Sequence, residues 1–285
     1  MAVLSKPLVR AVALAAALTD SKLVIIDCRH ELQDPEAGPR KFEEGHIPGA
    51  RHAHLDQDLA RPPRENEGRH PLPVVERFVD TLRRFGVSNE SFVVVYDDCG
   101  GAMAARLWWM LRWLGHEQVA VLDGGIAAWR AFGGGLEHGP VCEHATGNFL
   151  PTTVRDNWIV DTGELTDLLA QGEASLLDAR ARPRFDGLVE PIDSVAGHIP
   201  GAVSLPFSDL LSEDGTFLEA SALAERFAEA LRGGSASTAI TMCGSGVTAC
   251  HLQLGLEAAG LGMGRLYVGS WSEWIRDPER PVGKA

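Results

Sequence analysis

The sequence predicts an α/β protein of two tandem domains of one kind, each a mainly parallel sheet flanked by helices. Two observations carry this prediction: motifs recur in the same order, and each copy alternates short apolar runs with longer amphipathic ones. Of the 285 residues, 45% are hydrophobic and 23% are charged, which is typical of a globular protein. The length accommodates two domains of ordinary size.

Three motifs each occur twice. The hexapeptide GHIPGA stands at residues 45–50 and returns letter for letter at residues 197–202. Such order and spacing are not expected by chance, so they indicate two copies of one domain. The other two pairs are an Asp-x-Arg motif, at residues 27–29 and 178–180, and a segment that ends in a tryptophan, at Trp129 and Trp274.

The boundary between the copies is expected where periodicity is lost. Gly133-Gly134-Gly135 opens a stretch rich in Gly, His, Thr and Pro that has neither a helical nor a strand period. We therefore predict a first domain over residues 1–135, a linker over residues 136–153 and a second domain over residues 154–285.

The first copy begins with an Ala-rich segment, Ala11–Leu18, which we interpret as a helix rather than a signal peptide because its apolar run is short. Short runs of β-branched residues then alternate with segments whose apolar residues recur at helical spacing. The predicted strands are Leu23–Asp27, Phe92–Tyr96 and Val119–Leu122, and the predicted helices are Val74–Phe85 and Met103–Leu114.

The second copy repeats this alternation. Alternating strands and helices predict a parallel sheet that is covered on both faces. Ligands of such sheets bind outside the carboxyl ends of the strands. The predicted strands are Ser175–Asp178, Ala239–Met242 and Arg265–Val268, and the main helices are Ser221–Leu231 and Val247–Ala259.

The loop after Ala239–Met242 is the predicted active site. Cys243 follows the buried strand directly, and glycines at 244 and 246 allow a tight turn whose N–H groups converge on one point. The helix that follows adds its positive N-terminal end, so a cysteine there is stabilised as a nucleophilic thiolate. Val247 completes the loop, and Ser245 and Thr248 can add hydroxyl donors.

The same loop of the first copy has no sulfur nucleophile at the equivalent position. Trp129 and Trp274 are 145 residues apart, and that spacing places Cys243 opposite Asp98. Cys99 comes one position too late, and Met103 replaces Thr248. The first domain is therefore predicted to be catalytically silent. Cys28, Cys142 and Cys250 are interpreted as packing residues, and His46 and His198 of the GHIPGA segments as structural.

Several thiol chemistries fit this loop poorly. A cysteine phosphatase needs an arginine six residues after the nucleophile, where this chain has Ala249. A cysteine protease needs a histidine base, and thioredoxin chemistry needs a C-x-x-C pair, neither of which is found near Cys243. A persulfide carrier needs only a thiolate in a pocket rich in hydrogen-bond donors, which the loop provides.

The two-copy layout, the paired Asp-x-Arg and GHIPGA motifs and the single Cys243 loop resemble the tandem rhodanese-type sulfurtransferases. Within that family, the loop Cys-Gly-Ser-Gly-Val-Thr looks like that of the 3-mercaptopyruvate sulfurtransferase subgroup. The resemblance implies two rhodanese-like domains, of which only the second is catalytic.

The resemblance also assigns roles by position. Arg184, which precedes Phe185 shortly after the second Asp-x-Arg motif, is implied to bind the donor carboxylate. Many family members carry a second arginine in a Glu-Pro-Arg segment, where this chain has Ile192; Arg180 or Arg182 could compensate. A Ser–His–Asp relay of the subgroup corresponds to Ser245, His70 and Asp56.

The implied reaction moves sulfur from 3-mercaptopyruvate through a Cys243 persulfide to cyanide, a small thiol or a thioredoxin-like protein, and releases pyruvate. A thiosulfate:cyanide sulfurtransferase and a non-enzymatic persulfide relay or binding module remain alternatives. No metal or organic cofactor is implied. The formal net charge of −13 argues against nucleic acid and anionic membranes as partners. Five cysteines without a C-x-x-C pair favour a reducing, cytoplasmic location.

Overall fold

The computed structural model describes residues 6–140 and 144–284, and its contacts divide the chain into two compact units. The first unit comprises the residues up to Arg61, Pro73–Arg155 and Glu213–Phe217. The second comprises Pro62–Leu72, Asp156–Ser212 and the residues from Leu218 onward. Each unit therefore receives one short segment from the sequence range of the other.

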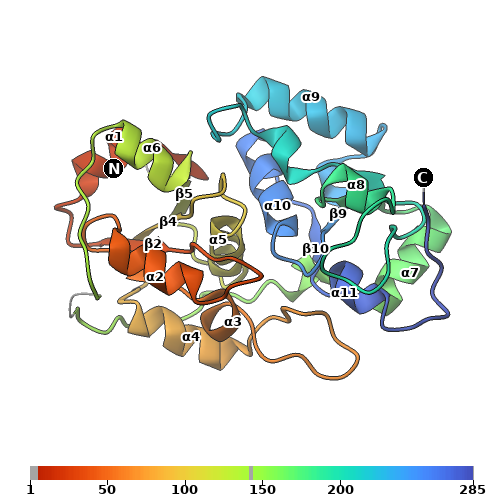
Figure 1. Cartoon of the computed structure of the whole chain (residues 1–285), viewed down its shortest axis with the longest axis horizontal. Coiled ribbons are helices and arrows are strands. Elements are labelled where there is room, and N and C mark those ends of the chain that lie inside the picture. Colours follow the sequence, from red (N-terminus) through yellow and green to blue (C-terminus); the bar gives the residue numbers. More distant parts are fainter. Residues whose placement is uncertain (1–5, 141–143, 285) are drawn as a thin grey trace. The chain divides into compact units, whose positions relative to one another are not determined.

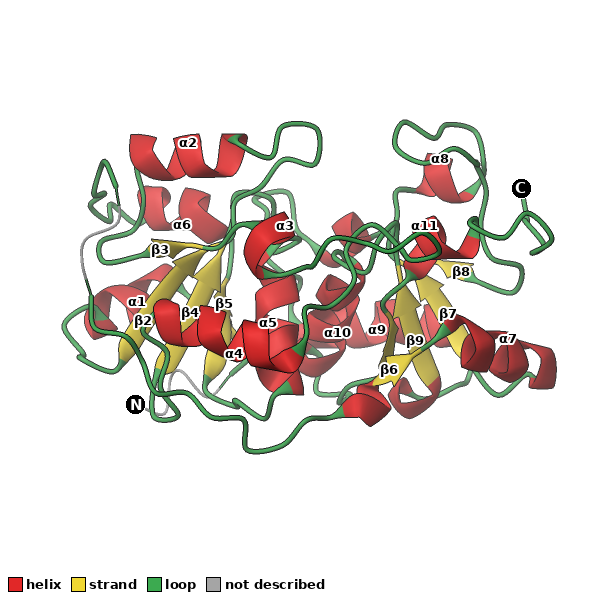
Figure 2. Ribbon diagram, turned by 90° about the horizontal axis from the view of Figure 1, so that it is seen from below, coloured by secondary structure: helices red, strands yellow, loops and turns green. Residues whose placement is uncertain are grey.

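The first unit contains a five-stranded parallel sheet with the strand order β1-β5-β4-β2-β3 (Figures 1 and 2). Its central strands β2 and β4 pair from Leu23 opposite Phe92 to Asp27 opposite Tyr96. In chain order its elements are β1 (Leu8–Val9), α1 (Ala11–Ala17), β2 (Leu23–Asp27), α2 (Ala37–Glu44), β3 (Arg51–His52), α3 (Leu55–Asp58), α4 (Val75–Arg84), β4 (Phe92–Tyr96), α5 (Ala104–Trp113), β5 (Val119–Leu122) and α6 (Gly125–Ala131).

The second unit repeats this topology with the strand order β6-β10-β9-β7-β8, again all parallel. Here β7 and β9 are the central pair, and Asp178 lies opposite Met242. The elements are η2 (Asp156–Trp158), β6 (Ile159–Val160), α7 (Thr162–Gln171), β7 (Ser175–Asp178), α8 (Arg182–Phe185), β8 (Val203–Ser204), η3 (Phe207–Leu210), α9 (Ala220–Leu231), η4 (Ala236–Thr238), β9 (Ala239–Met242), α10 (Ala249–Ala258), β10 (Arg265–Tyr267) and α11 (Ser270–Trp274).

Each sheet is buried on both faces, which explains the unbroken apolar character of its strands. In the first unit, Ile25, Val94 and Ala120 form one core with residues of α1, α2 and α6. The alternate strand residues are also buried, and α5 packs against β4 and β5. In the second unit, Leu176 and Ile240 pack in a core with residues of α7 and α11, while α10 contacts β9 and β10.

The predicted fold class is confirmed. Five of the six predicted strands have the predicted bounds, and β10 ends one residue earlier, at Tyr267. Helix α10 begins at Ala249 rather than at Val247, because the nucleophile loop occupies residues 243–248.

Residues 136–153, predicted as a linker, pack along the first unit where they are described. Glu137 and His46 exchange two backbone hydrogen bonds of 2.9 Å each. Further on, the N–H of Phe149 donates to the carbonyl of Val87 at 3.1 Å, and the side chain of Phe149 is buried. The second unit ends in a similar way, since Gly283 and His198 exchange the same pair of backbone hydrogen bonds.

The histidines of the two GHIPGA motifs have structural roles in both units. His46 stacks on Phe42 with ring centroids 3.8 Å apart, and His198 stacks on Phe185 at 3.9 Å. The Nδ1 atom of each lies 2.8 Å from the carbonyl oxygen of its stacked phenylalanine. These contacts fix backbone segments and agree with the interpretation of both histidines as structural.

Among the described residues, no helix combines the length and the apolar character needed to cross a bilayer.

Candidate active site

The loop between β9 and α10 concentrates backbone donors on a single sulfur. Cys243 directly follows β9 and is only 2% exposed. Its Sγ accepts hydrogen bonds from the N–H of Ser245 at 3.4 Å and from the N–H of Gly246 at 3.1 Å. Two N–H dipoles aimed at one sulfur stabilise negative charge there, as the sequence predicts.

The short helix α11 holds this loop in shape. Its N–H groups at Trp271 and Ser272 donate to the carbonyls of Cys243 and Gly244, at 3.0 and 2.9 Å. The N–H of Cys243 donates in turn to Ser270 Oγ at 3.1 Å. Helix α11 therefore fixes the backbone of Cys243, while the N–H groups of the loop form the hydrogen bonds to its sulfur.

Gly246 cannot be replaced without moving the backbone. Its φ is +77°, in the left-handed region, and a Cβ at this position would lie 2.4 Å from the carbonyl oxygen of Val268. Both constraints require glycine. The predicted turn function of this residue follows from its conformation and its surroundings.

Two predicted relay residues are in contact. Ser245 Oγ lies 2.7 Å from His70 Nδ1, and the two residues are 4% and 6% exposed. His70 belongs to the segment Pro62–Leu72, which lies between α3 and α4 in the sequence but within the second unit. The side chain that could exchange a proton with Ser245 is thus part of the same unit as Cys243.

Asp56, the third predicted relay member, lies in α3 of the first unit, and its catalytic role stays a prediction. Its backbone N–H donates to His54 Nδ1 at 3.2 Å. Ligand atoms of His30, His54 and Asp56 all lie within 4.8 Å of one another. In residues 6–140 and 144–284, this is the one His/Cys/Asp/Glu group found with spacing that could hold a metal.

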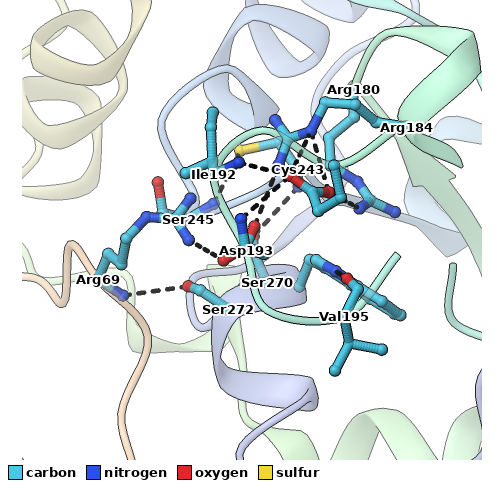
Figure 3. A network of polar contacts seen from close by, with 12 residues as sticks. Arg69, Arg180, Arg184, Ile192, Asp193, Val195, Cys243, Ser245, Ser270 and Ser272 are labelled. Atoms are coloured by element: carbon cyan, nitrogen blue, oxygen red, sulfur yellow. Dashed lines mark hydrogen bonds and ion pairs between the residues drawn. The ribbon is translucent and has the colours of Figure 1, made fainter. Parts of the chain in front are cut away.

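Arg184, the predicted donor-binding residue, lies above the nucleophile loop (Figure 3). A Cβ on Gly244 would lie 3.6 Å from its Nη2 and 3.7 Å from its Nη1. Two buried carboxylates hold the guanidinium: Glu190 Oε1 is 2.7 Å from Nη2, and Asp193 Oδ2 is 3.1 Å from the same atom. Burial opposes ionisation of Glu190, but its hydrogen bond with Arg184 prevails and lowers its pKa.

Arg180 has a structural role. Its Nη2 donates to Asp178 Oδ2 at 2.7 Å and to the carbonyl of Gly197 at 2.8 Å. In the first unit, Arg29 makes the same two contacts, at 2.6 Å to Asp27 and at 2.9 Å to the carbonyl of Gly45. The Asp-x-Arg motif thus ties a strand end to the GHIPGA segment in both units.

The remaining predicted contact residues contribute mainly through the backbone. Val247 is buried, and its carbonyl accepts from the N–H of Cys250 at 3.0 Å. Thr248 is the N-cap residue of α10, but its side chain does not cap the helix. The predicted contact of its hydroxyl with a substrate stays a prediction.

Other thiols are placed less favourably than Cys243. Burial raises the pKa of Cys28 and of Cys99 well above the ordinary value for a thiol, and nearby aspartates raise both further. Cys250 Sγ lies 3.4 Å from the carbonyl oxygen of Gly246, inside α10. Cys142 lies outside the described residues.

The equivalent of Cys243 in the first unit is Asp97, not Asp98 as the constant spacing predicted. Met242 pairs with Asp178 and Tyr96 with Asp27, so the residue after each strand is Cys243 or Asp97. The first loop is one residue longer, spanning 97–103 rather than 243–248, which shifts the count. The first domain is still predicted to be catalytically silent, because the residue equivalent to Cys243 is an aspartate in either alignment.

One residue near the site was missed by the sequence analysis. A Cβ on Gly244 would lie 3.0 Å from Nη2 of Arg69, the residue just before His70. Arg69 also forms an ion pair with Asp193 (Figure 3). Two features of the sequence could have identified Arg69: its position next to His70 and the absence of an arginine at position 192.

Comparisons with known proteins agree with this geometry. A family model described as "Rhodanese-like domain" matches residues 11–132 and again residues 161–277. A probable 3-mercaptopyruvate sulfurtransferase of Pseudomonas aeruginosa is 48% identical over 280 residues, which cover 98% of each chain. A putative thiosulfate sulfurtransferase of Mycobacterium tuberculosis is 41% identical over 266 residues, 91% of this chain and 90% of the relative.

A solved structure shares the whole fold. The 3-mercaptopyruvate sulfurtransferase from Leishmania major superimposes with a TM-score of 0.85 at 31% identity, covering 96% of this chain and 76% of its own. Both the repeated domain and the overall architecture are therefore similar to those of known enzymes.

Proposed function

Since this chain belongs to the rhodanese family and is a sulfurtransferase with two rhodanese-like domains, we propose that it uses 3-mercaptopyruvate as donor and Cys243 as sulfur carrier. The observation that carries this proposal is the surroundings of Cys243 Sγ. Two backbone N–H groups point at the sulfur, and the guanidinium of Arg184 lies over the adjacent Gly244. An anionic donor could thus place its sulfur at the thiolate while its carboxylate is held nearby.

In the first half-reaction, the Cys243 thiolate attacks the donor sulfur and forms the S–S bond. The C–S bond of the donor breaks, its electron pair stays on carbon, and the enolate of pyruvate leaves. The enolate takes up a proton and becomes pyruvate. Ser245, which is in contact with His70 at 2.7 Å, is suited to deliver that proton.

In the second half-reaction, a nucleophile attacks the outer sulfur of the persulfide. Cyanide leaves as thiocyanate, and a small thiol or a thioredoxin-like thiol leaves as its own persulfide. The electron pair of the broken S–S bond returns to Cys243, which restores the thiolate. Throughout, the loop N–H groups stabilise the charge on sulfur. We place this chemistry in the cytoplasm, because it needs a reduced thiol.

Intact-protein mass spectrometry tests the proposal. Wild-type protein treated with 3-mercaptopyruvate and no acceptor should gain the mass of one sulfur atom, as covalent catalysis requires. Cyanide should then remove that mass and release thiocyanate. Cys243→Ser should gain nothing, and Cys250→Ser should behave as wild type. An adduct that persists in Cys243→Ser would refute the assignment.

Thiosulfate is the second candidate donor. The loop itself contains no basic residue, but Arg69 and Arg184 both lie over Gly244, and their charges suit a dianion too. The relative in Mycobacterium tuberculosis is named as a putative thiosulfate sulfurtransferase. Parallel measurement of kcat/KM with the two donors decides between them; a value higher for thiosulfate would overturn our choice. The similarity to enzymes along nearly the whole chain disfavours a non-enzymatic persulfide relay.

A further inference from the structure

Two imidazoles and one carboxylate come together at the carboxyl edge of the first sheet. His30 follows the end of β2 by three residues, and His54 follows the end of β3 by two. Since β2 and β3 are neighbouring parallel strands, both rings lie at the edge where parallel sheets bind ligands (Figure 2). Asp56 lies in α3, which begins directly after His54. Ligand atoms of the three side chains all lie within 4.8 Å of one another.

We propose that His30, His54 and Asp56 form a binding site for a divalent transition-metal ion such as Zn²⁺. Imidazole nitrogens and carboxylate oxygens are ligands that zinc binds in proteins, and three protein ligands leave a fourth position open for water. The site lies wholly within the first unit and does not depend on the sulfur-transfer reaction. It gives the first unit a ligand of its own, and it gives Asp56 a role that is independent of the predicted relay.

His54 provides the strongest evidence that a ligand binds here. The residue is only 7% exposed, and within the described part of the chain its Nε2 has no hydrogen-bond partner. A buried polar nitrogen of this kind costs free energy unless a partner satisfies it. The other ring nitrogen, Nδ1, accepts the N–H of Asp56 at 3.2 Å. The ring of His30 is the nearest aromatic neighbour given for this ring, with centroids 5.5 Å apart.

Coordination by His54 needs a lone pair on the nitrogen that binds the metal. Because Nδ1 accepts a hydrogen bond, the neutral ring carries its proton on Nε2. Binding through Nε2 moves this proton to Nδ1 and breaks the hydrogen bond with the Asp56 N–H, whereas binding through Nδ1 replaces that bond directly. In both cases the ring stays neutral, no proton is released, and the amide of Asp56 loses its acceptor.

The backbone beside both histidines is fixed by groups outside the proposed site. The N–H of His54 donates to Asp58 Oδ2 at 2.8 Å. Next to His30, the N–H of Arg29 donates to Asp27 Oδ1 at 2.9 Å. Hydrogen bonds of this kind orient the ligands in known metal sites. The two imidazoles therefore extend from chain segments that are already held in place.

The spacing of the three side chains is suited to a small ion that enters from solvent. Asp56 is more exposed than either histidine, so an ion can reach the carboxylate first. Ligand atoms around a tetrahedral zinc ion lie about 3.4 Å apart. Each pair of ligand atoms in this cluster therefore needs to close by about 1.4 Å at most, which side-chain rotation supplies.

The test titrates metal into Cys243→Ser protein, because the nucleophilic thiolate of the wild type can itself bind zinc. Co²⁺ is the spectroscopic probe, and Zn²⁺ is the competitor. One equivalent of Co²⁺ should bind and give visible absorption without the charge-transfer band of thiolate ligation, and Zn²⁺ should abolish this absorption. A thiolate band, or no bound metal at all, would overturn the proposal.

Variants of the three ligands in the same background make the test specific. His30→Ala and Asp56→Ala should each weaken Co²⁺ binding more than about 10-fold, because even changes to outer-shell partners weaken metal binding 10- to 100-fold. His54→Asn should do the same and still cap α3, since asparagine is a favoured N-cap residue. His138→Ala is the matched control, because it removes an exposed histidine of the same unit. Equal affinity in His54→Asn and His138→Ala would contradict the assignment.

Two further measurements separate metal binding from altered packing. Zn²⁺ should raise the unfolding temperature of Cys243→Ser protein, because a ligand that binds only the folded chain stabilises it, and it should not do so in His54→Asn. The NMR signal of the Asp56 amide should shift on addition of Zn²⁺, because its acceptor on His54 is lost. An Asp56 amide signal that stays unchanged at saturating Zn²⁺ would show that the metal binds elsewhere.

Discussion

The loops after β4 and after β9 are built alike, but the first begins with an aspartate and the second with a cysteine. In the first unit, the buried carboxylate of Asp97 accepts four backbone N–H groups, at 2.8 to 3.0 Å, from Cys99, Gly101, Met103 and Ala104. In the second unit, Cys243 Sγ accepts two such groups from its own loop. In both units the loop directs backbone N–H groups at one side chain and stabilises negative charge there. An aspartate at this position has a structural role, whereas a cysteine can act as a nucleophile.

The cations above the two loops differ as well. Lys41 immediately precedes Phe42, as Arg184 precedes Phe185, and its Nζ lies 2.7 Å from Asp98 Oδ2. Lys41 is thus paired with a carboxylate of the first loop itself, and also with Glu31 at 2.7 Å. In the second loop the position after the nucleophile is Gly244, so Arg184 finds its carboxylates outside the loop. A side chain at position 244 would approach Nη2 of Arg69 to 3.0 Å, so the glycine lets the guanidinium groups lie close to the loop backbone.

The largest effect is expected when the second loop receives the group of the first. Cys243→Asp should abolish persulfide formation and turnover, since a carboxylate cannot accept the donor sulfur as a persulfide. The protein should stay folded, because the first loop holds a carboxylate in the same place. Mass spectrometry with 3-mercaptopyruvate and thermal unfolding measure the two results. Unfolding of Cys243→Asp would show that the two cradles are not equivalent.

Removal of the hydroxyl at Ser245 should have the next largest effect. Positioned proton transfer contributes about 100- to 10,000-fold, so Ser245→Ala should lower kcat by a factor in this range with little change in KM. If Ser245 and His70 act as one unit, Ser245→Ala/His70→Asn should be no slower than either single variant. Additive losses in steady-state kinetics would contradict a shared function.

Gly246→Ala tests how far the loop geometry itself matters. The positive φ and the close carbonyl of Val268 force the loop to move, and a shift near 1 Å can cost on the order of 100-fold in rate. Gly260→Ala is the matched control, because Gly260 has a φ of +74° but no atom within 4 Å of its missing Cβ. Kinetics and thermal unfolding of both variants separate the backbone clash from the cost of the dihedral angle. Equal activity of the two variants would show that the clash does not matter.

The central strands were predictable because they are buried on both faces, which requires an unbroken run of β-branched and aromatic residues such as Phe92–Tyr96. The strands β1, β3, β6 and β8 were not predicted, since two residues carry no period. Cys243 was identifiable because its signals, a strand end and two glycines, are local in the sequence. Arg69 was not, because its partners Asp193 and Ser272 are more than 120 residues away and only the folded chain brings them together.

The segment Pro62–Leu72 illustrates the same limit for domain organisation. Its sequence position lies within the first copy, yet its contacts belong to the second unit. No periodicity distinguishes a loop that packs on its own domain from one that packs on the other. The hydrogen bond of Gly68 with Glu273 joins residues that are 205 positions apart in the sequence, so no local pattern indicates it.

Arg184→Ala and Lys41→Ala test the comparison of the two cations. Arg184→Ala removes about 1.5–3 kcal/mol of donor binding, so kcat/KM for 3-mercaptopyruvate should fall roughly 10- to 150-fold. Lys41→Ala should leave kcat/KM unchanged and reduce the free energy of unfolding by about 1 kcal/mol or less, because partly exposed ion pairs contribute little. An unaffected Arg184→Ala enzyme would place the donor carboxylate elsewhere. An equal loss in Lys41→Ala would contradict the assignment of catalysis to the second loop alone.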